Sequence, residues 1–264
     1  TKSLPDNFNE PVAAITVETF AARRAYQLAD KLRAAGKTVI IGGFHPTMLP
    51  YEAGKHADAV IIGDAEDTWP IALADLQAGG LKERYISRGD TDLSALVYDY
   101  RAFQGFHYLP VGMVQFGRGC KFSCDFCSIH AFYGGSVRMR PLQSLIDDIR
   151  KLRQPYLFFI DDNLFADEKA AMELFKALIP LHKKWVCQIS MDAARRPELL
   201  RLMRKSGCRM VIVGFESLDP ENLRQMGKGV NHGAADYETV IRNIYDAGIM
   251  IYGTFVIGYD ADTP

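Results

Sequence analysis

The stretch that decides the fold is Gly117–His130, which reads GRGCKFSCDFCSIH. Its three cysteines, Cys120, Cys124 and Cys127, follow the spacing Cys-x3-Cys-x2-Cys, which lets one compact loop bring three thiolates to one centre. Thiolates suit soft centres such as iron–sulfur clusters and zinc. Three thiolates leave one metal position open, whereas a structural zinc site wants a fourth ligand, which His130 offers. Spacing alone therefore leaves both a cluster and zinc open.

Strand and helix patterns alternate around this loop. Apolar runs predict strands at 113–116, 156–160, 185–189, 209–215 and 249–257. Helical patterns lie between them, at 142–152, 167–183, 197–206, 220–226 and 234–247. Repeated β–α units of this size indicate a (β/α) barrel, whole or partial, in which the working residues lie at the carboxyl ends of the strands.

The first third of the chain alternates in the same way. Apolar runs predict strands at 12–17, 38–41 and 57–62, and helices are expected at 18–35 and 67–78. This order predicts a parallel sheet in a doubly wound layer. Residues 81–109 show no clear periodicity, so we expect 89–109 to link two domains, at 1–88 and 110–264.

Composition excludes several classes of function. Lys plus Arg is 31 and Asp plus Glu is 32, and this balance gives no pull toward nucleic acid or an anionic membrane. There is no apolar run of about 18 residues and no signal-peptide core, so we expect a cytoplasmic protein without a transmembrane helix. Five cysteines, three of them close together, argue against a disulfide framework. The chain lacks an initial Met and stops after an apolar run, so we expect part of a longer protein, truncated at the carboxyl end of its barrel.

Phe126 gives the loop the form Cys-x3-Cys-x-aromatic-Cys. With the strand before it, this form resembles the signature of the radical S-adenosylmethionine (SAM) superfamily, and the resemblance covers about 111–264. It implies that the three cysteines hold a [4Fe–4S] cluster whose open iron binds the amino and carboxylate groups of SAM. One electron then cleaves SAM to a 5′-deoxyadenosyl radical. An external electron donor such as flavodoxin or ferredoxin is implied as well.

The same resemblance assigns SAM contacts by place in the barrel. Asp162 follows the second strand, where many relatives have a Gly-Gly-Glu-like motif for the SAM amino group, although that motif is missing here. Polar residues that end the next two strands correspond to contacts with the ribose and the methionine end of SAM. The positions assigned to SAM are Asp162, Gln188, Ser190, Glu216, Phe126 and Ile129, the last two beside adenine.

Structural interpretations compete with some of these assignments. Acids after strands often cap helices, which applies to Asp161 and Asp167. Cys187 and Cys208 stand in apolar surroundings, where buried structural thiols are expected.

Gly42 and Gly43 follow a predicted strand, where glycine allows close backbone approach to a ligand. The pair, the His-Pro-Thr that comes soon after it and a Gly-x-x-Glu loop at 63–66 resemble the cobalamin-binding domain of cobalamin-dependent radical SAM proteins. The resemblance places the Gly-Gly loop beside the nucleotide tail of cobalamin and matches Thr16 to a Ser/Thr position. The Asp-x-His-x-x-Gly motif of other cobalamin proteins is absent, and we interpret His45, which lies in another loop, as structural.

The predicted fold class is therefore α/β, a partial Rossmann-like cobalamin-binding domain followed by an incomplete (β/α) radical SAM partial barrel. SIHAFYGGSVRMRP at 128–141 and FFIDDNLFAD at 158–167 resemble hopanoid and bacteriochlorophyll methylases. The resemblance implies methyl transfer to an unactivated carbon of a small-molecule or lipid-like substrate, a lipid or pigment precursor. One alternative is another cobalamin-dependent radical reaction, such as cyclisation or rearrangement. A second is a non-enzymatic zinc- or cluster-binding module. A methylthiotransferase would need a second cysteine trio, which the sequence lacks.

Overall fold

The computed structural model describes residues 9–96, 99, 109–231 and 234–262. The chain divides into two compact units between Asp92 and Leu93, within the segment expected to link two domains. Part of that segment, 97–98 and 100–108, lies outside the described residues.

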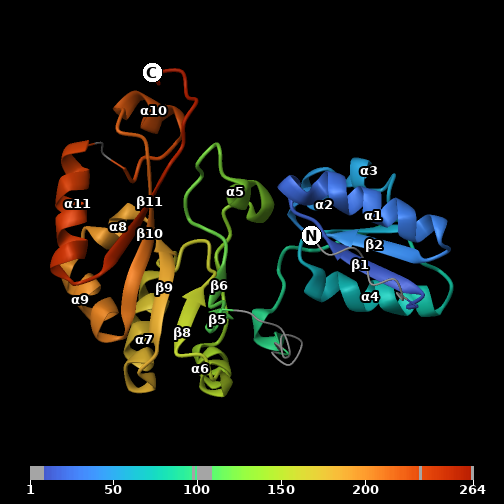
Figure 1. Cartoon of the computed structure of the whole chain (residues 1–264), viewed down its shortest axis with the longest axis horizontal. Coiled ribbons are helices and arrows are strands. Elements are labelled where there is room, and N and C mark those ends of the chain that lie inside the picture. Colours follow the sequence, from blue (N-terminus) through green and yellow to red (C-terminus); the bar gives the residue numbers. More distant parts are fainter. Residues whose placement is uncertain (1–8, 97–98, 100–108, 232–233, 263–264) are drawn as a thin grey trace. The chain divides into compact units, whose positions relative to one another are not determined.

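The first unit is built on a parallel sheet of four strands in the order β1-β2-β3-β4. The strands are β1 (Val12–Thr16), β2 (Thr38–Gly42), β3 (Ala59–Ile62) and β4 (Arg84–Ile86). The helical segments are η1 (Thr19–Ala21), α1 (Ala22–Ala34), α2 (Phe44–Met48), α3 (Pro50–Ala53) and α4 (Ala65–Gln77). Figure 1 shows α1 on one face of this sheet and α4 on the other. Two separate apolar clusters bury these faces, one including Ala29 and Ile41 and the other Ile40 and Ala72.

The second unit contains a parallel sheet of five strands in the order β11-β10-β9-β8-β5. Its strands are β5 (Val111–Val114), β8 (Tyr156–Phe159), β9 (Lys184–Ile189), β10 (Cys208–Glu216) and β11 (Met250–Phe255). A small antiparallel pair consists of β6 (Gly117–Arg118) and β7 (Arg138–Met139). The helical segments are η2 (Leu93–Ala95), α5 (Ser128–Tyr133), α6 (Leu142–Lys151), α7 (Glu168–Leu178), η4 (Ile179–Leu181), α8 (Met191–Ala194), α9 (Pro197–Lys205), α10 (Pro220–Gln225) and α11 (Ala234–Asp246).

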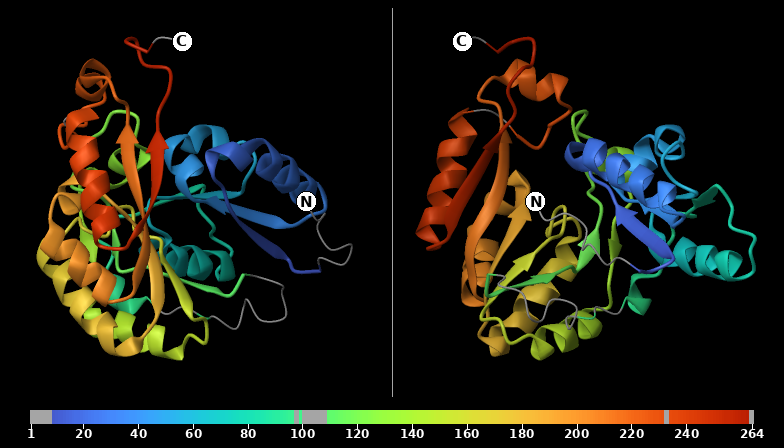
Figure 2. Two further views of the ribbon diagram at one scale, coloured as in Figure 1. Left: turned by 60° about the vertical axis from the view of Figure 1, so that its left-hand side comes forward. Right: turned by 45° about the vertical axis from the view of Figure 1, so that its right-hand side comes forward.

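The main core of the second unit lies between this sheet and the helices α6, α7, α9 and α11. Figures 1 and 2 show these helices along one side of the parallel strands, as in a partial barrel. At its centre the Trp185 ring stacks on Phe175 and meets Phe159 edge-on, and its indole N–H donates to the Ser206 carbonyl oxygen at 3.0 Å. Burial of such large side chains contributes most of the stability of a core.

Three expectations about elements need correction. The short strand β4 falls where no periodicity was expected, because three residues are too few to show a pattern. The helix expected over 167–183 ends at Leu178, since Pro180 lacks a backbone N–H and disfavours helical geometry before it. The strand expected at 113–116 ends at Val114, and the Phe116 N–H donates to a side chain instead.

None of the helices in the described part of the chain has the length and apolar content needed to cross a lipid bilayer.

Candidate functional site

The antiparallel strands β6 and β7 flank the cysteine loop and pair with each other, with Gly117 opposite Met139 and Arg118 opposite Arg138. Gly119, directly after β6, has φ +89°, and a Cβ there would lie 1.9 Å from the Ser136 carbonyl oxygen. No other residue fits this crossing without moving the backbone. The Gly-Arg-Gly that precedes the first cysteine thus lets the two ends of the loop approach each other closely.

Three consecutive residues after β8 hold the start of the loop. The Asp161 carboxylate accepts the backbone N–H of Phe116 at 3.0 Å and that of Gly117 at 2.5 Å. Asp162 accepts the Gly119 N–H at 2.8 Å. The Asn163 amide lies 3.8 Å from the Cys120 sulfur and donates to it. The carboxyl end of β8 therefore fixes the backbone that leads to the first cysteine.

Burial changes the acidity of these two acids. Asp161 is 4% exposed, and desolvation raises its pKa from the ordinary 3.8 to about 7, against the opposing effect of its two backbone donors. Desolvation also raises the pKa of Asp162, while the Gly119 N–H and the Arg118 guanidinium oppose the rise. Asp161 is thus a loop anchor and caps no helix, whereas Asp167 caps α7 by accepting the Ala170 N–H at 2.9 Å.

Contacts from distant segments hold the middle of the loop. The Asp125 N–H donates to the Met226 carbonyl oxygen at 3.0 Å, directly after α10. The Tyr259 hydroxyl donates to the Asp125 carboxylate at 2.5 Å, and this bond is the main reason that the pKa of Tyr259 rises to about 12. The loop is therefore held both by the residues after β8 and by the segments that follow α10 and β11.

The three thiols of the loop are free, with Cys124 buried and Cys120 and Cys127 partly exposed. Burial raises the pKa of the Cys124 thiol, and the nearby Lys228 ammonium group opposes the rise. The other two cysteines, Cys187 and Cys208, are fully buried in the core on β9 and β10. Three thiols on one loop with no disulfide are the donor set that a cluster with one open iron needs.

Zinc makes a different demand on the same loop. Within the described residues, no three His, Cys, Asp or Glu side chains converge as a single metal ion requires. A cubane cluster spreads its thiolates over three separate irons. His130, the fourth zinc ligand considered above, lies in α5, and its buried Nδ1 has no hydrogen-bond partner in the described part of the chain. The donor chemistry of the loop fits a cluster, and metal analysis distinguishes the two.

The residues assigned to SAM lie at the ends of neighbouring strands and on the loop. Ser190 is buried, accepts from the Asn163 amide at 3.0 Å and donates to Asp192. Gln188 is exposed on β9. Phe126 is 40% exposed in the loop, and Ile129 is half-buried on α5. The fold thus brings polar groups from β8, β9 and β10 to the edge where the cysteines lie, as parallel strands do.

Lys228, which the sequence did not indicate, occupies the same edge. Its ammonium group donates to the Glu216 carboxylate at 2.7 Å, and both side chains are largely buried. It also lies 5.8 Å from the centre of the Phe126 ring. The sequence singled out only Glu216, because its ion-pair partner stands twelve residues later.

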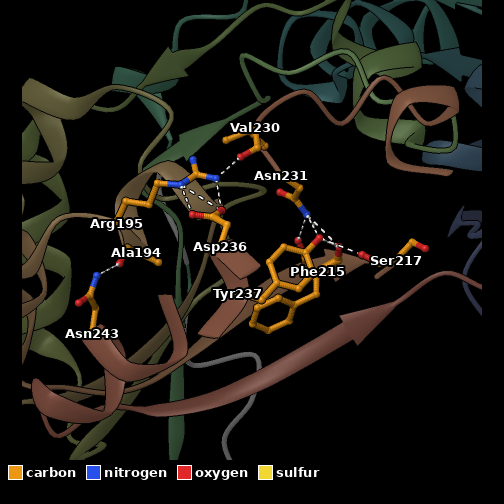
Figure 3. A network of polar contacts seen from close by, with 10 residues as sticks. Ala194, Arg195, Phe215, Ser217, Val230, Asn231, Asp236, Tyr237 and Asn243 are labelled. Carbon is orange, nitrogen blue, oxygen red and sulfur yellow. Dashed lines mark hydrogen bonds and ion pairs between the residues drawn. The ribbon is translucent and has the colours of Figure 1, made fainter. Parts of the chain in front are cut away.

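A polar network supports the end of β10. The register of β10 against β11 shifts between Gly214 and Glu216, so that Phe215 forms a bulge. Figure 3 shows the Asn231 amide and the Tyr237 hydroxyl directed at this backbone, and both donate to the Phe215 carbonyl oxygen, at 2.9 and 2.6 Å. Tyr237 also donates to the Ser217 carbonyl oxygen at 2.9 Å. Bulges of this kind re-aim side chains beside functional sites.

In the first unit, Thr16 ends β1 and pairs in register with Gly42 at the end of β2, next to Gly43. The Thr47 hydroxyl donates to the Gly43 carbonyl oxygen at 2.8 Å and accepts the Gly63 N–H at 2.9 Å, which ties the two glycine loops together. These groups lie at the carboxyl edge of the parallel sheet, where such sheets bind ligands.

His45 has partners for both ring nitrogens. Nδ1 lies 3.3 Å from the Thr19 hydroxyl and Nε2 lies 3.1 Å from the Glu52 carboxylate, and the residue is 6% exposed. The hydrogen bond from His45 is the largest cause of a lowered pKa of Glu52. These contacts support the structural interpretation of His45.

Comparison with known proteins decides the family. The profile of the radical SAM superfamily matches residues 114–262, which span the cysteine loop and the five-stranded sheet apart from the start of β5. The chain belongs to the radical SAM superfamily. It is 33% identical over 273 aligned positions to bacteriochlorophyllide d C-12(1)-methyltransferase of Chlorobaculum tepidum, an alignment that covers 99% of this chain. It is 31% identical to hopanoid C-2 methylase of Rhodopseudomonas palustris over 58% of this chain and 31% of that one. The predicted relationship to these methylases is confirmed.

A solved structure confirms the fold class of this radical SAM protein. TsrM, a radical SAM methyltransferase of Kitasatospora setae, matches 96% of this chain and 58% of its own with a TM-score of 0.81 at 16% identity. Another structure of TsrM holds cobalamin and a [4Fe–4S] cluster. The present chain spans 60% of the length of the bacteriochlorophyllide methyltransferase.

The raised pKa of Asp161 predicts an unusual dependence of stability on pH. Because the folded-state pKa is about 7 and the ordinary value is 3.8, the folded protein binds more protons at this site than the unfolded chain between these values. The contribution of Asp161 to stability is therefore full below pH 3.8 and is lost as pH rises toward 7. The D161N variant lacks this titration. Relative to the variant, the free energy of unfolding of the wild-type protein should fall by up to about 4 kcal/mol between pH 3.8 and 7.

Urea unfolding of both proteins without cofactors, followed by circular dichroism at several pH values, measures this difference. D147N, at an exposed acid of α6, is the matched control and should follow the wild-type pH dependence. A free-energy difference between wild type and D161N that does not change with pH would contradict the assigned burial of this carboxyl group.

Proposed function

We propose that Cys120, Cys124 and Cys127 hold a [4Fe–4S] cluster, and that the protein is a cobalamin-dependent radical SAM methyltransferase. The main support is that three free thiols lie on one loop, which is fixed to the carboxyl edge of the partial barrel in a radical SAM protein. When bound, the cluster would supply the electron for reductive cleavage of SAM. An external donor such as flavodoxin or ferredoxin would then return an electron to the cluster.

The residues of the chain then have separate tasks. The three cysteines bind the cluster, and Asp161 orients their loop through the backbone. Asp162, Gln188, Ser190 and Glu216 offer polar groups to SAM from three adjacent strand ends. Phe126 and Ile129 offer apolar surface to the adenine. Hydrogen bonds within the protein already engage most of these polar groups, so the binding edge is ordered before SAM arrives.

For cobalamin, we assign the site to residues 1–88, with Thr16, Gly42 and Gly43 at its edge, and the radical chemistry to 110–264. Support comes from the Rossmann-like sheet of the first unit and from TsrM, which holds cobalamin. When bound, cobalamin supplies the methyl group. Thr47 keeps the Gly43 and Gly63 loops in place at the edge where the nucleotide tail would lie.

An apolar substrate suits the open face of the barrel sheet. The register places five side chains in one row across β5, β8, β9, β10 and β11, on the face opposite the helices. The row consists of Met113, Phe158, Val186, Met210 and Met250. Methionine and aromatic side chains adapt to large apolar ligands. The relatives act on a bacteriochlorophyllide and on hopanoids, so we propose a pigment or lipid precursor as substrate.

Metal analysis tests the cluster. After anaerobic reconstitution, the protein should contain about four irons and four sulfides per chain, as in a cubane cluster. C124A should lose the cluster, because a buried ligand of the loop is removed. C208A, which removes a buried thiol on β10, is the matched control and should keep its iron. One zinc without sulfide in the wild-type protein would instead support the binding-module alternative.

Product analysis tests the reaction. With SAM, methylcobalamin, a reductant and a bacteriochlorophyllide or hopanoid substrate, the full-length protein should release both 5′-deoxyadenosine and S-adenosylhomocysteine, measured by liquid chromatography and mass spectrometry. The second product reports remethylation of cobalamin by another SAM molecule. Deoxyadenosine without S-adenosylhomocysteine would contradict methyl transfer and support a different cobalamin-dependent radical reaction, such as cyclisation or rearrangement.

A further inference from the structure

The Lys228–Glu216 ion pair is a largely buried pair of charges beside the cysteine loop. The exposed fraction of the side chain is 13% for Lys228 and 7% for Glu216. Two buried charges lose their hydration, and this loss offsets much of their mutual attraction. Such a pair therefore adds little net stability, so a contribution to folding does not by itself explain its place beside the cysteine loop.

The backbone is shaped to bring the Glu216 carboxylate to Lys228. Glu216 has φ +66°, in the left-handed region that side chains other than glycine rarely adopt. Directly before the bulge, a Cβ on Gly214 would lie 2.0 Å from the Glu216 Oε1 atom and 3.2 Å from the Lys228 Nζ atom. The missing side chain of Gly214 thus leaves the space that the ion pair fills. Asn231 and Tyr237 hold the bulge by its carbonyl oxygens (Figure 3).

Lys228 is fixed against the cysteine loop by its own backbone as well. Met226 accepts the Asp125 N–H at 3.0 Å, and a Cβ on Gly227 would lie 3.3 Å from the Ser123 carbonyl oxygen. The segment before Lys228 therefore packs directly on Ser123 and Asp125, the two neighbours of Cys124. The ammonium group lies 5.8 Å from the centre of the Phe126 ring, and a Cβ on Gly227, the residue before Lys228, would lie 4.0 Å from the Cys124 Cα atom.

We propose that Lys228 is a positioning residue that raises the reduction potential of the cluster by holding a positive charge beside Cys124, with Glu216 as its partly neutralising counter-ion. The inference rests on the proposed cluster at the three cysteines. A reduced cluster carries one more negative charge than the oxidised cluster, so a fixed cation nearby favours reduction. The two charges should therefore shift the potential in opposite directions.

The test is a redox titration of the reconstituted protein, monitored by electron paramagnetic resonance (EPR) without SAM, so that any role of Glu216 in binding SAM does not enter. K228M should shift the potential to more negative values, on the order of tenfold in the reduction equilibrium, or about 59 mV for one electron. E216Q should shift it to less negative values. The double variant K228M/E216Q should lie between K228M and E216Q, because it removes both of the opposing charges.

Two controls separate charge from structure. K228R keeps the charge and should keep the potential close to that of the wild-type protein. K205M removes an exposed lysine at the end of α9 and should leave the potential unchanged. Iron and sulfide are measured in every sample. If K228M fails to fold or to take up iron, E216Q and the double variant carry the test.

Equal potentials in the wild-type protein and in the loaded K228M and E216Q variants would overturn the proposal, as would shifts of the same sign in both. Absence of a cluster from the wild-type protein is a different result, because it would refute the proposed function and not the role of Lys228 alone.

Discussion

The contact on which the rest of the site depends is the pair of carboxylates after β8 that accept backbone N–H groups from the start of the cysteine loop. Asp161 binds Phe116 and Gly117, and Asp162 binds Gly119. These hydrogen bonds are made to the main chain, so they fix the position of the backbone that leads to Cys120 independently of the cysteine side chain. Asp161 is buried where it does this, and desolvation raises its pKa to about 7.

From this anchor the site extends along the carboxyl edge of the sheet. Asn163 links Cys120 to Ser190 at the end of β9, and the bulge at the end of β10 directs Glu216 to Lys228. Lys228 in turn stands on the backbone that packs against the loop, and Tyr259 holds Asp125 from the segment after β11. The ends of strands β8 to β11 thus each contribute at least one support to a loop that has little regular structure of its own.

Local signals in the sequence were sufficient for the architecture and were enough to single out the three cysteines as candidate ligands. The spacing of Cys120, Cys124 and Cys127 lies within eight residues, and most strands and helices are long enough to show their period. The partners of the loop were hidden, because hydrogen bonds such as Tyr259 to Asp125 join residues 134 positions apart. Asp161 looked like a helix cap because a carboxylate after a strand serves either purpose. The roles assigned to the three cysteines and to the residues proposed to contact SAM and cobalamin stay predictions.

The central claim is that the loop holds a cluster with one open iron, positioned by the end of β8 at the edge where SAM binds. The most direct measurement is the EPR spectrum of the reduced, reconstituted protein with and without SAM. We predict a spectrum typical of a reduced [4Fe–4S] cluster whose g values change when SAM is added, because SAM binds the iron that has no cysteine ligand. A cluster spectrum that SAM leaves unchanged, or no cluster spectrum at all, would contradict the account.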